Sequence, residues 1–198
     1  HVAVDVVYAG YILIADEIRS DSAQAIQELK GSNINQIVML TGDSVSAGEK
    51  VAKELGLSKV YAELLPSDKV DKLEELLMQI SGSGKLAYVG DGINDAPVLA
   101  RADVGIAMGG LGSDAAIEAA DVVIMTDEPS KIPLAINISK KVMGIANQNI
   151  KFAIGVKTLI LLLSAFGITN LWAAIFGDVG VTIIAILNSF RALAVKEE

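Results

Sequence analysis

Apolar residues follow two different patterns along this chain. Up to about residue 128, short apolar runs alternate with stretches in which apolar residues recur every three or four positions. The short runs predict buried strands, and the periodic stretches predict helices. Strands and helices that alternate in this order are typical of a parallel sheet with helical crossovers on both faces. We therefore expect residues 1–128 to form an α/β domain with a doubly wound parallel sheet.

Glycines, prolines and capping residues set the bounds of the expected elements. The first two strands are expected to form a hairpin through residues 8–10. The expected strands span residues 2–7, 11–15, 36–40, 60–62, 86–89, 104–108 and 122–125. The expected helices begin at Ser20-Asp21, Val45, Pro66, Asp95 and Asp114.

The pattern lengthens after residue 128. Residues 131–149 predict an amphipathic helix, and residues 152–168 and 171–193 are apolar runs about long enough to cross a bilayer. Basic residues precede the first run and follow the second, which predicts that both ends lie in the cytoplasm. We therefore expect residues 129–198 to hold a lead-in and a two-helix transmembrane hairpin. A buried hairpin inside a large soluble protein is the alternative, and the length of both runs disfavours it.

Composition narrows the class of partner. The net charge of −8 argues against nucleic acid, because binding a phosphate backbone requires clustered Lys and Arg. The absence of cysteine excludes disulfides and thiolate metal sites within this chain. The chain opens on residues that read as the middle of a strand, without a signal sequence. We expect it to be the carboxyl-terminal part of a longer protein.

The string Gly90-Asp91-Gly92-Ile93-Asn94-Asp95-Ala96-Pro97 follows the expected strand at 86–89. It places two carboxylates, Asp91 and Asp95, and the amide of Asn94 at the carboxyl end of a parallel strand, where ligands bind in such sheets. Oxygen ligands on a tight turn suit Mg²⁺. The alternative is that Asn94 or Asp95 only caps the next helix.

This string resembles the hinge signature of the P-type ATPases. The strings Thr41-Gly42-Asp43 and Pro66-Ser67-Asp68-Lys69 and a final pair of membrane helices resemble that family in the same order. The resemblance covers essentially the whole chain. It implies a haloacid-dehalogenase-like phosphorylation domain at 1–128 that lacks its nucleophile strand, followed by the transmembrane hairpin. It also implies ATP hydrolysis through an aspartyl phosphate, with ATP and Mg²⁺ as cofactors.

The resemblance assigns roles to the first two strings. Thr41 would hydrogen-bond the phosphoryl oxygens, and Lys69 would neutralise the charge that develops on them. Gly42 and Asp43 belong to the same loop, and Asp43 would support the nucleotide or the loop. Taken singly, Lys69 reads as a solvated lysine at the start of a helix.

The hinge string carries the expected magnesium site. Asp91 would hold Mg²⁺, while Asn94 and Asp95 would orient the ion and the phosphate, with Asp95 as a second candidate ligand. The Asp-Lys-Thr-Gly-Thr string that holds the family's phosphorylated aspartate does not occur in this chain. We therefore expect the chain by itself to be inactive.

Two ionisable residues fall within the apolar runs, Lys157 and Asp178. Such residues cost at least ~2.5 kcal/mol at bilayer depth and usually face a pathway or a partner. Asn149 lies eight positions before Lys157, and Asp178-Val179-Gly180 forms Asp-x-Gly, which resembles the zinc, cadmium and lead branch of the heavy-metal P-type ATPases. Asp178 would then bind the transported ion, and Lys157 would be its counter-charge. The alternatives are that Lys157 reaches an interface and that Asp178 faces external water.

The resemblance implies that this chain is the carboxyl-terminal part of an ATP-driven pump that exports Zn²⁺, Cd²⁺ or Pb²⁺. The expected partners are the transported ion, the lipid bilayer and an amino-terminal part of the same pump. The expected location is a bacterial cell membrane, with the soluble domain in the cytoplasm. Three alternatives remain: a P-type ATPase for another cation, a membrane-tethered dehalogenase-like phosphatase, and a non-catalytic membrane interaction module.

Overall fold

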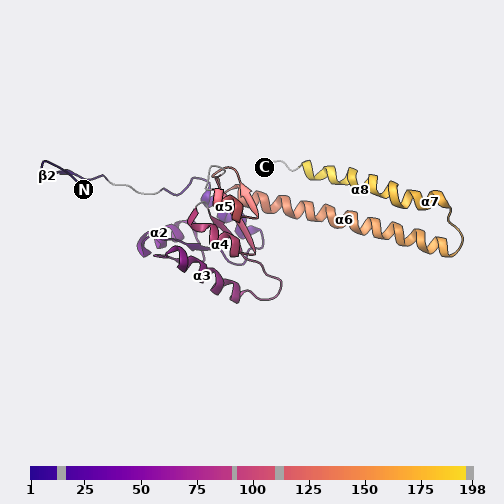
Figure 1. The fold of residues 1–198 in the computed structure, drawn as a ribbon, viewed down its shortest axis with the longest axis horizontal. Helices are drawn as coiled ribbons and strands as arrows, with labels where there is room; N and C mark the ends of the chain where they lie inside the picture. The colour runs from indigo at the N-terminus through magenta and orange to yellow at the C-terminus, as the bar shows by residue number, and fades with distance from the viewer. Residues whose placement is uncertain (13–16, 91–92, 110–113, 195–198) are drawn as a thin grey trace. The chain divides into compact units, whose positions relative to one another are not determined.

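A computed structural model describes the chain except residues 13–16, 91–92, 110–113 and 195–198. It divides into two compact units, His1–Lys131 and Ile132–Glu198. The first unit holds short strands and helices, and the second holds the long helical segments (Figure 1).

An antiparallel hairpin opens the first unit. It pairs β1 (Val2–Val4) with β2 (Val7–Gly10). Asp5 and Val6 connect them with φ angles of 49° and 68°, and positive φ at both residues is what a tight two-residue hairpin turn requires. This turn starts the second strand at Val7, and β2 runs to Gly10, so the turn expected at residues 8–10 is wrong. Of the second strand expected at 11–15, residues 11–12 are not in a strand, and residues 13–15 lie outside the described residues.

The other strands are all parallel. One sheet pairs β3 (Val38–Leu40) with β4 (Lys59–Tyr61). The second sheet has the order β5 (Ala87–Gly90), β6 (Val104–Met108) and β7 (Val122–Ile124). Helices connect successive strands, so the expected α/β class with a parallel sheet is confirmed.

Local signals set the bounds of the helices in this unit. Ser44 caps α2 by accepting a hydrogen bond from the backbone N–H of Ala47, and Gly56 ends the helix in the left-handed conformation. At the start of α3 the Asp68 carboxylate accepts from the backbone N–H of Leu65 at 2.9 Å. The helices are α1 (Ser22–Gly31), α2 (Val45–Leu55), α3 (Pro66–Gln79), the 3₁₀ turn η1 (Ile93–Asp95), α4 (Ala96–Arg101) and α5 (Asp114–Ala119).

The core of this unit surrounds β6. Leu99 of α4, Ala107 of β6 and Ala116 of α5 are buried together, and Tyr88 of β5 packs against them. Gly105 lets α4 approach β6 closely, because a Cβ at this position would lie 2.6 Å from the Leu99 carbonyl oxygen. This packing fixes the carboxyl end of β5 and the start of α4, between which the hinge string runs.

The second unit begins with a single long helix, α6 (Lys131–Ala165), of 35 residues. The lead-in helix expected at 131–149 and the apolar run at 152–168 form one continuous helix. No proline lies between these two segments, and Gly144 and Gly155 are accommodated within the helix.

The second helical segment of this unit changes its winding along its length. It consists of α7 (Leu171–Ile175), a π-helical turn η2 (Phe176–Gly180), α8 (Val181–Ser189) and a 3₁₀ turn η3 (Phe190–Ala194). Asn170 starts it as an N-cap, since its side-chain oxygen accepts from the backbone N–H of Ala173 at 3.1 Å. By length and composition, Lys131–Ala165 and Leu171–Leu193 are both able to cross a membrane.

Candidate functional site

Lys69 and Asp95 form an ion pair at the carboxyl end of β5. Lys69 lies in the first turn of α3, and its Nζ is 2.8 Å from Asp95 Oδ1. Only 17% of the lysine side chain and 11% of the aspartate side chain are exposed. A pair this deeply buried depends on both partners, because removal of one leaves an uncompensated charge. The structure therefore joins two residues that the sequence places 26 positions apart.

Tyr88 is a further member of this site that the sequence analysis missed. Its hydroxyl donates to Asp95 Oδ1 at 2.9 Å. Tyr88 and Gly90 are two residues apart on a strand and so face the same side of the sheet, which is the signal that could have found it. A Cβ on Gly90 would lie 2.9 Å from Asp95 Cβ and 3.0 Å from Asp95 Oδ2, so a glycine is needed beside this carboxylate.

The Asp95 side chain does not cap the next helix. Asp95 occupies the N-cap position of α4, but its side chain makes no capping hydrogen bond. Asn94 is exposed in η1. Asp91, the expected magnesium ligand, lies outside the described residues, so its role stays a prediction.

The loop after β3 holds Thr41, Gly42 and Asp43. The Thr41 hydroxyl donates to Asp43 Oδ2 at 2.8 Å and accepts from the Asp43 backbone N–H at 3.1 Å. The Thr41 carbonyl accepts from the backbone N–H of Leu64 at 3.1 Å, and a Cβ on Gly42 would lie 3.3 Å from the Leu64 carbonyl oxygen. The loop is thus tied to the segment that leads into α3 and Lys69.

The donor chemistry at Asp95 is compatible with Mg²⁺. Among the described residues no three His, Cys, Asp or Glu side chains gather to hold a metal ion. Mg²⁺ does not need such a cluster, since it takes one or two carboxylates plus waters and phosphate oxygens. Lys69 and Tyr88 both bind Asp95 Oδ1, which leaves Oδ2 as the oxygen for an ion.

A second ion pair lies in the helical unit. Lys157 Nζ of α6 is 2.9 Å from Asp178 Oδ1, and 56% and 76% of these side chains are exposed. Asp178 belongs to the π-helical turn η2, a rare geometry that is frequent at functional sites. The hydroxyl of Thr182 donates to the Asp178 carbonyl at 2.7 Å. The structure therefore brings together the two residues that the sequence singled out in the apolar runs.

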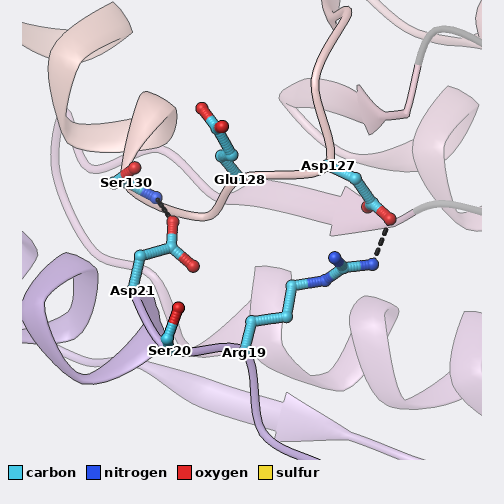
Figure 2. A pocket seen from close by; sticks show the side chains of 6 residues that line it. All are labelled: Arg19, Ser20, Asp21, Asp127, Glu128 and Ser130. Carbon is cyan, nitrogen blue, oxygen red and sulfur yellow. Dashed lines mark hydrogen bonds and ion pairs between the residues drawn. The ribbon is translucent and has the colours of Figure 1, made fainter.

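An open pocket in the first unit lies between two connecting segments and includes none of the predicted site residues (Figure 2). Arg19 forms an ion pair with Asp127 across it, and Asp21 Oδ2 accepts from the backbone N–H of Ser130 at 2.9 Å. The hydrogen bond from the Ser130 backbone lowers the pKa of Asp21, while the partial burial of the Asp21 carboxyl acts in the opposite direction. The pocket has a volume of about 490 Å³ and is lined by Arg19, Ser20, Asp21, Asp127, Glu128 and Ser130.

The chain resembles bacterial metal-transporting ATPases along its length. It is 59% identical over 198 residues to a cadmium, zinc and cobalt-transporting ATPase of Bacillus subtilis, covering 100% of this chain and 28% of that protein. It is 59% identical over 191 residues to a zinc-transporting ATPase of Synechocystis sp., covering 96% of this chain and 26% of that protein. The chain thus spans little more than a quarter of the length of these relatives.

Solved structures agree with this resemblance. A crystal structure of a zinc-transporting PIB-type ATPase in an E2·Pi state matches 90% of this chain and 28% of its own, with a TM-score of 0.82 and 39% identity. The expected resemblance to heavy-metal P-type ATPases is therefore confirmed. The model of haloacid dehalogenase-like hydrolases matches residues 1–103, which is more than half of the chain. The chain belongs to the haloacid dehalogenase-like hydrolases.

Proposed function

We propose that this chain is the carboxyl-terminal part of an ATP-driven pump that exports Zn²⁺, Cd²⁺ or Pb²⁺ through an aspartyl-phosphate intermediate. The observation that carries the proposal is the Lys157–Asp178 ion pair between two helices long and apolar enough to cross a membrane. A soluble phosphatase has no use for such a pair, whereas a cation pathway does. The metal-transporting relatives support the same choice of cargo.

In the phosphoryl-transfer site, the residues of this chain position and neutralise charge. Asp95 holds the Lys69 ammonium in place, and Lys69 would face the phosphoryl group as its charge develops. The Thr41 hydroxyl would donate to a phosphoryl oxygen in place of its present acceptor, Asp43, and Gly42 and Asp43 would support the bound ATP. This division of work needs little covalent chemistry from the protein.

Mg²⁺ fits the carboxylates of the hinge string. Asp91 would be the first ligand of Mg²⁺ and Asp95 a second candidate ligand, while Asn94 would orient the ion and the phosphate. When bound, Mg²⁺ would neutralise charge on the transferring phosphoryl group. We expect this site to fail without the ion, because Lys69 alone leaves most of that charge uncompensated.

The sheets support a phosphorylation domain, residues 1–128, that lacks its nucleophile strand. Among the described strands, β3 pairs only with β4, and β5 pairs only with β6. β3 and β5 therefore each have an edge with no partner among the described strands, with which another strand of the pump is able to pair. With the phosphorylated aspartate on such a strand, this chain alone would not turn over ATP.

In the hairpin, Asp178 would bind the transported ion. A carboxylate suits a divalent cation of borderline softness together with ligands from elsewhere in the pump. Lys157 would compensate the carboxylate when the ion is absent, since an unpaired charge at bilayer depth is costly. Residues 129–198 would then cross a bacterial cell membrane, with both ends and the soluble domain in the cytoplasm.

The full-length pump with Asp91→Ala tests the phosphoryl-transfer half of this proposal. We expect loss of Mg²⁺-dependent phosphorylation by ATP and by inorganic phosphate, measured as acid-stable phosphoenzyme. The matched control is Asp71→Ala, which removes an exposed carboxylate of α3 and should leave phosphorylation unchanged. Normal phosphoenzyme formation by Asp91→Ala would refute the assigned role.

A further inference from the structure

A second set of polar contacts joins the two helical segments away from the Lys157–Asp178 pair. Asn149 of α6 donates through Nδ2 to the Ala185 carbonyl and to Ser189 Oγ, both at 3.0 Å. Its Oδ1 accepts from Asn188 Nδ2 at 2.8 Å. The amide of Asn149 therefore uses both of its donors and its acceptor on the opposite helix.

Arg191 extends this set of contacts on both sides. Its Nη1 donates to Asn188 Oδ1 at 3.0 Å and to Gln148 Oε1 at 3.4 Å. Asn188 is thereby held between Asn149 and Arg191, with its donor and its acceptor both engaged. A sideways or axial shift of either helix would break several of these hydrogen bonds together.

The position of Asn149 makes this set of contacts relevant to the ion pair. Asn149 precedes Lys157 by eight residues, which is about 12 Å along a helix that rises 1.5 Å per residue. Apolar side chains pack between membrane helices without a strong preference for one axial position, whereas hydrogen bonds fix one. The Asn149 contacts and the Lys157–Asp178 pair together fix the axial position of α6 relative to the helical segment that carries Asp178.

We propose that Asn149 and Asn188 form a register lock, which sets the axial position of α6 against α8 and thereby holds Lys157 opposite Asp178. They are positioning residues and do not bind the ion. This role rests on the proposed function of Asp178 as the ion-binding carboxylate. Removing these hydrogen bonds should lower the affinity of the site for the ion, while the phosphoryl-transfer chemistry persists.

The test uses the full-length pump with Zn²⁺ as the only probe. Asn149→Ala is expected to raise the zinc concentration for half-maximal ATPase stimulation by about three- to tenfold, with the maximal rate per phosphorylatable pump within about twofold. Asn188→Ala should give the same shift from the opposite helix, and the double variant should shift no further. Asn147→Ala, an exposed asparagine on α6, is the matched control and should behave as the wild type.

Phosphorylation by inorganic phosphate without zinc counts the folded pumps in each preparation. A lower count with an unshifted half-maximal zinc concentration, or additive shifts in the double variant, would overturn the register lock. Asp178→Ala in the same assay distinguishes the proposed ion site from the register lock. If its zinc stimulation survives, the proposed ion site is wrong; if it is lost while both asparagine variants stay unshifted, only the register lock is wrong.

Discussion

Three groups converge on the side chain of Asp95. Lys69 and Tyr88 donate to one carboxylate oxygen, and the other lies where a Cβ on Gly90 would intrude. Within the part of the chain that the structure describes, Asp95 is the only charged residue that is buried. A buried carboxylate is tolerated when it is paired and hydrogen-bonded, so its partners should contribute strongly to stability.

Lys69→Ala tests this dependence. The variant should lower the free energy of unfolding by about 2–3 kcal/mol, because it strands a largely buried carboxylate. Lys85→Ala is the matched control: its pair with Asp103 is mostly exposed on the lysine side, at 72%, and its loss should cost much less. Urea unfolding of the detergent-solubilised chain, followed by circular dichroism, measures both. Equal losses in the two variants would show that Lys69 does not stabilise Asp95.

At the scale of elements, two segments far apart in the chain hold the region before α6. Asp21 at the start of α1 accepts from the backbone of Ser130, and Arg19 pairs with Asp127 (Figure 2). The Ser130 hydrogen bond lowers the pKa of Asp21 in the folded chain. These contacts fix the end of the segment from which α6 begins at Lys131.

The lowered pKa of Asp21 has a consequence for pH dependence. A carboxyl whose folded-state pKa is depressed stabilises the fold above its unfolded pKa of about 3.9, and that contribution is lost as the pH falls through the folded value. Asp21→Asn keeps an oxygen that can accept from Ser130 but cannot be charged. The variant should melt below the wild type at pH 7, and the gap should close below about pH 4. A gap that is constant from pH 7 to pH 3 in thermal melts would contradict this.

Elements with strong end signals could be predicted from the sequence. Residues 45–55, 104–108 and 114–119 form the helix, strand and helix expected there, because a serine cap, a run of β-branched and small apolar residues and an acidic first turn mark them. The opening hairpin was misplaced because its turn uses Asp5-Val6, and a β-branched residue is a poor signal for positive φ. The continuity of α6 was not predicted, because its amphipathic first part and its apolar second part differ in polarity.

The candidate site was only partly predictable for a different reason. Motifs identified Lys69, Asp95, Lys157 and Asp178, and the resemblance assigned the first two to one phosphoryl-transfer site. Hydrogen bonds such as that from Tyr88 to Asp95 depend on packing that periodicity does not encode. The π-helical turn around Asp178 was likewise not predicted, because the sequence analysis had no pattern specific to this geometry.

The whole molecule carries two candidate sites, one in each of its compact units. One unit carries the Lys69–Asp95 pair at a sheet edge, and the other carries the Lys157–Asp178 pair between apolar helices. A pump needs both, and it needs each to respond to the state of the other. In the proposed function, Asp178 serves the cation and phosphoryl transfer belongs to the first unit.

The most direct test is ATP-driven zinc uptake into inside-out vesicles that contain the full-length pump with Asp178→Ala. Phosphorylation by inorganic phosphate is measured on the same vesicles. We predict that zinc uptake is abolished while phosphorylation persists at the wild-type level. Zinc uptake at the wild-type rate by this variant would contradict the account.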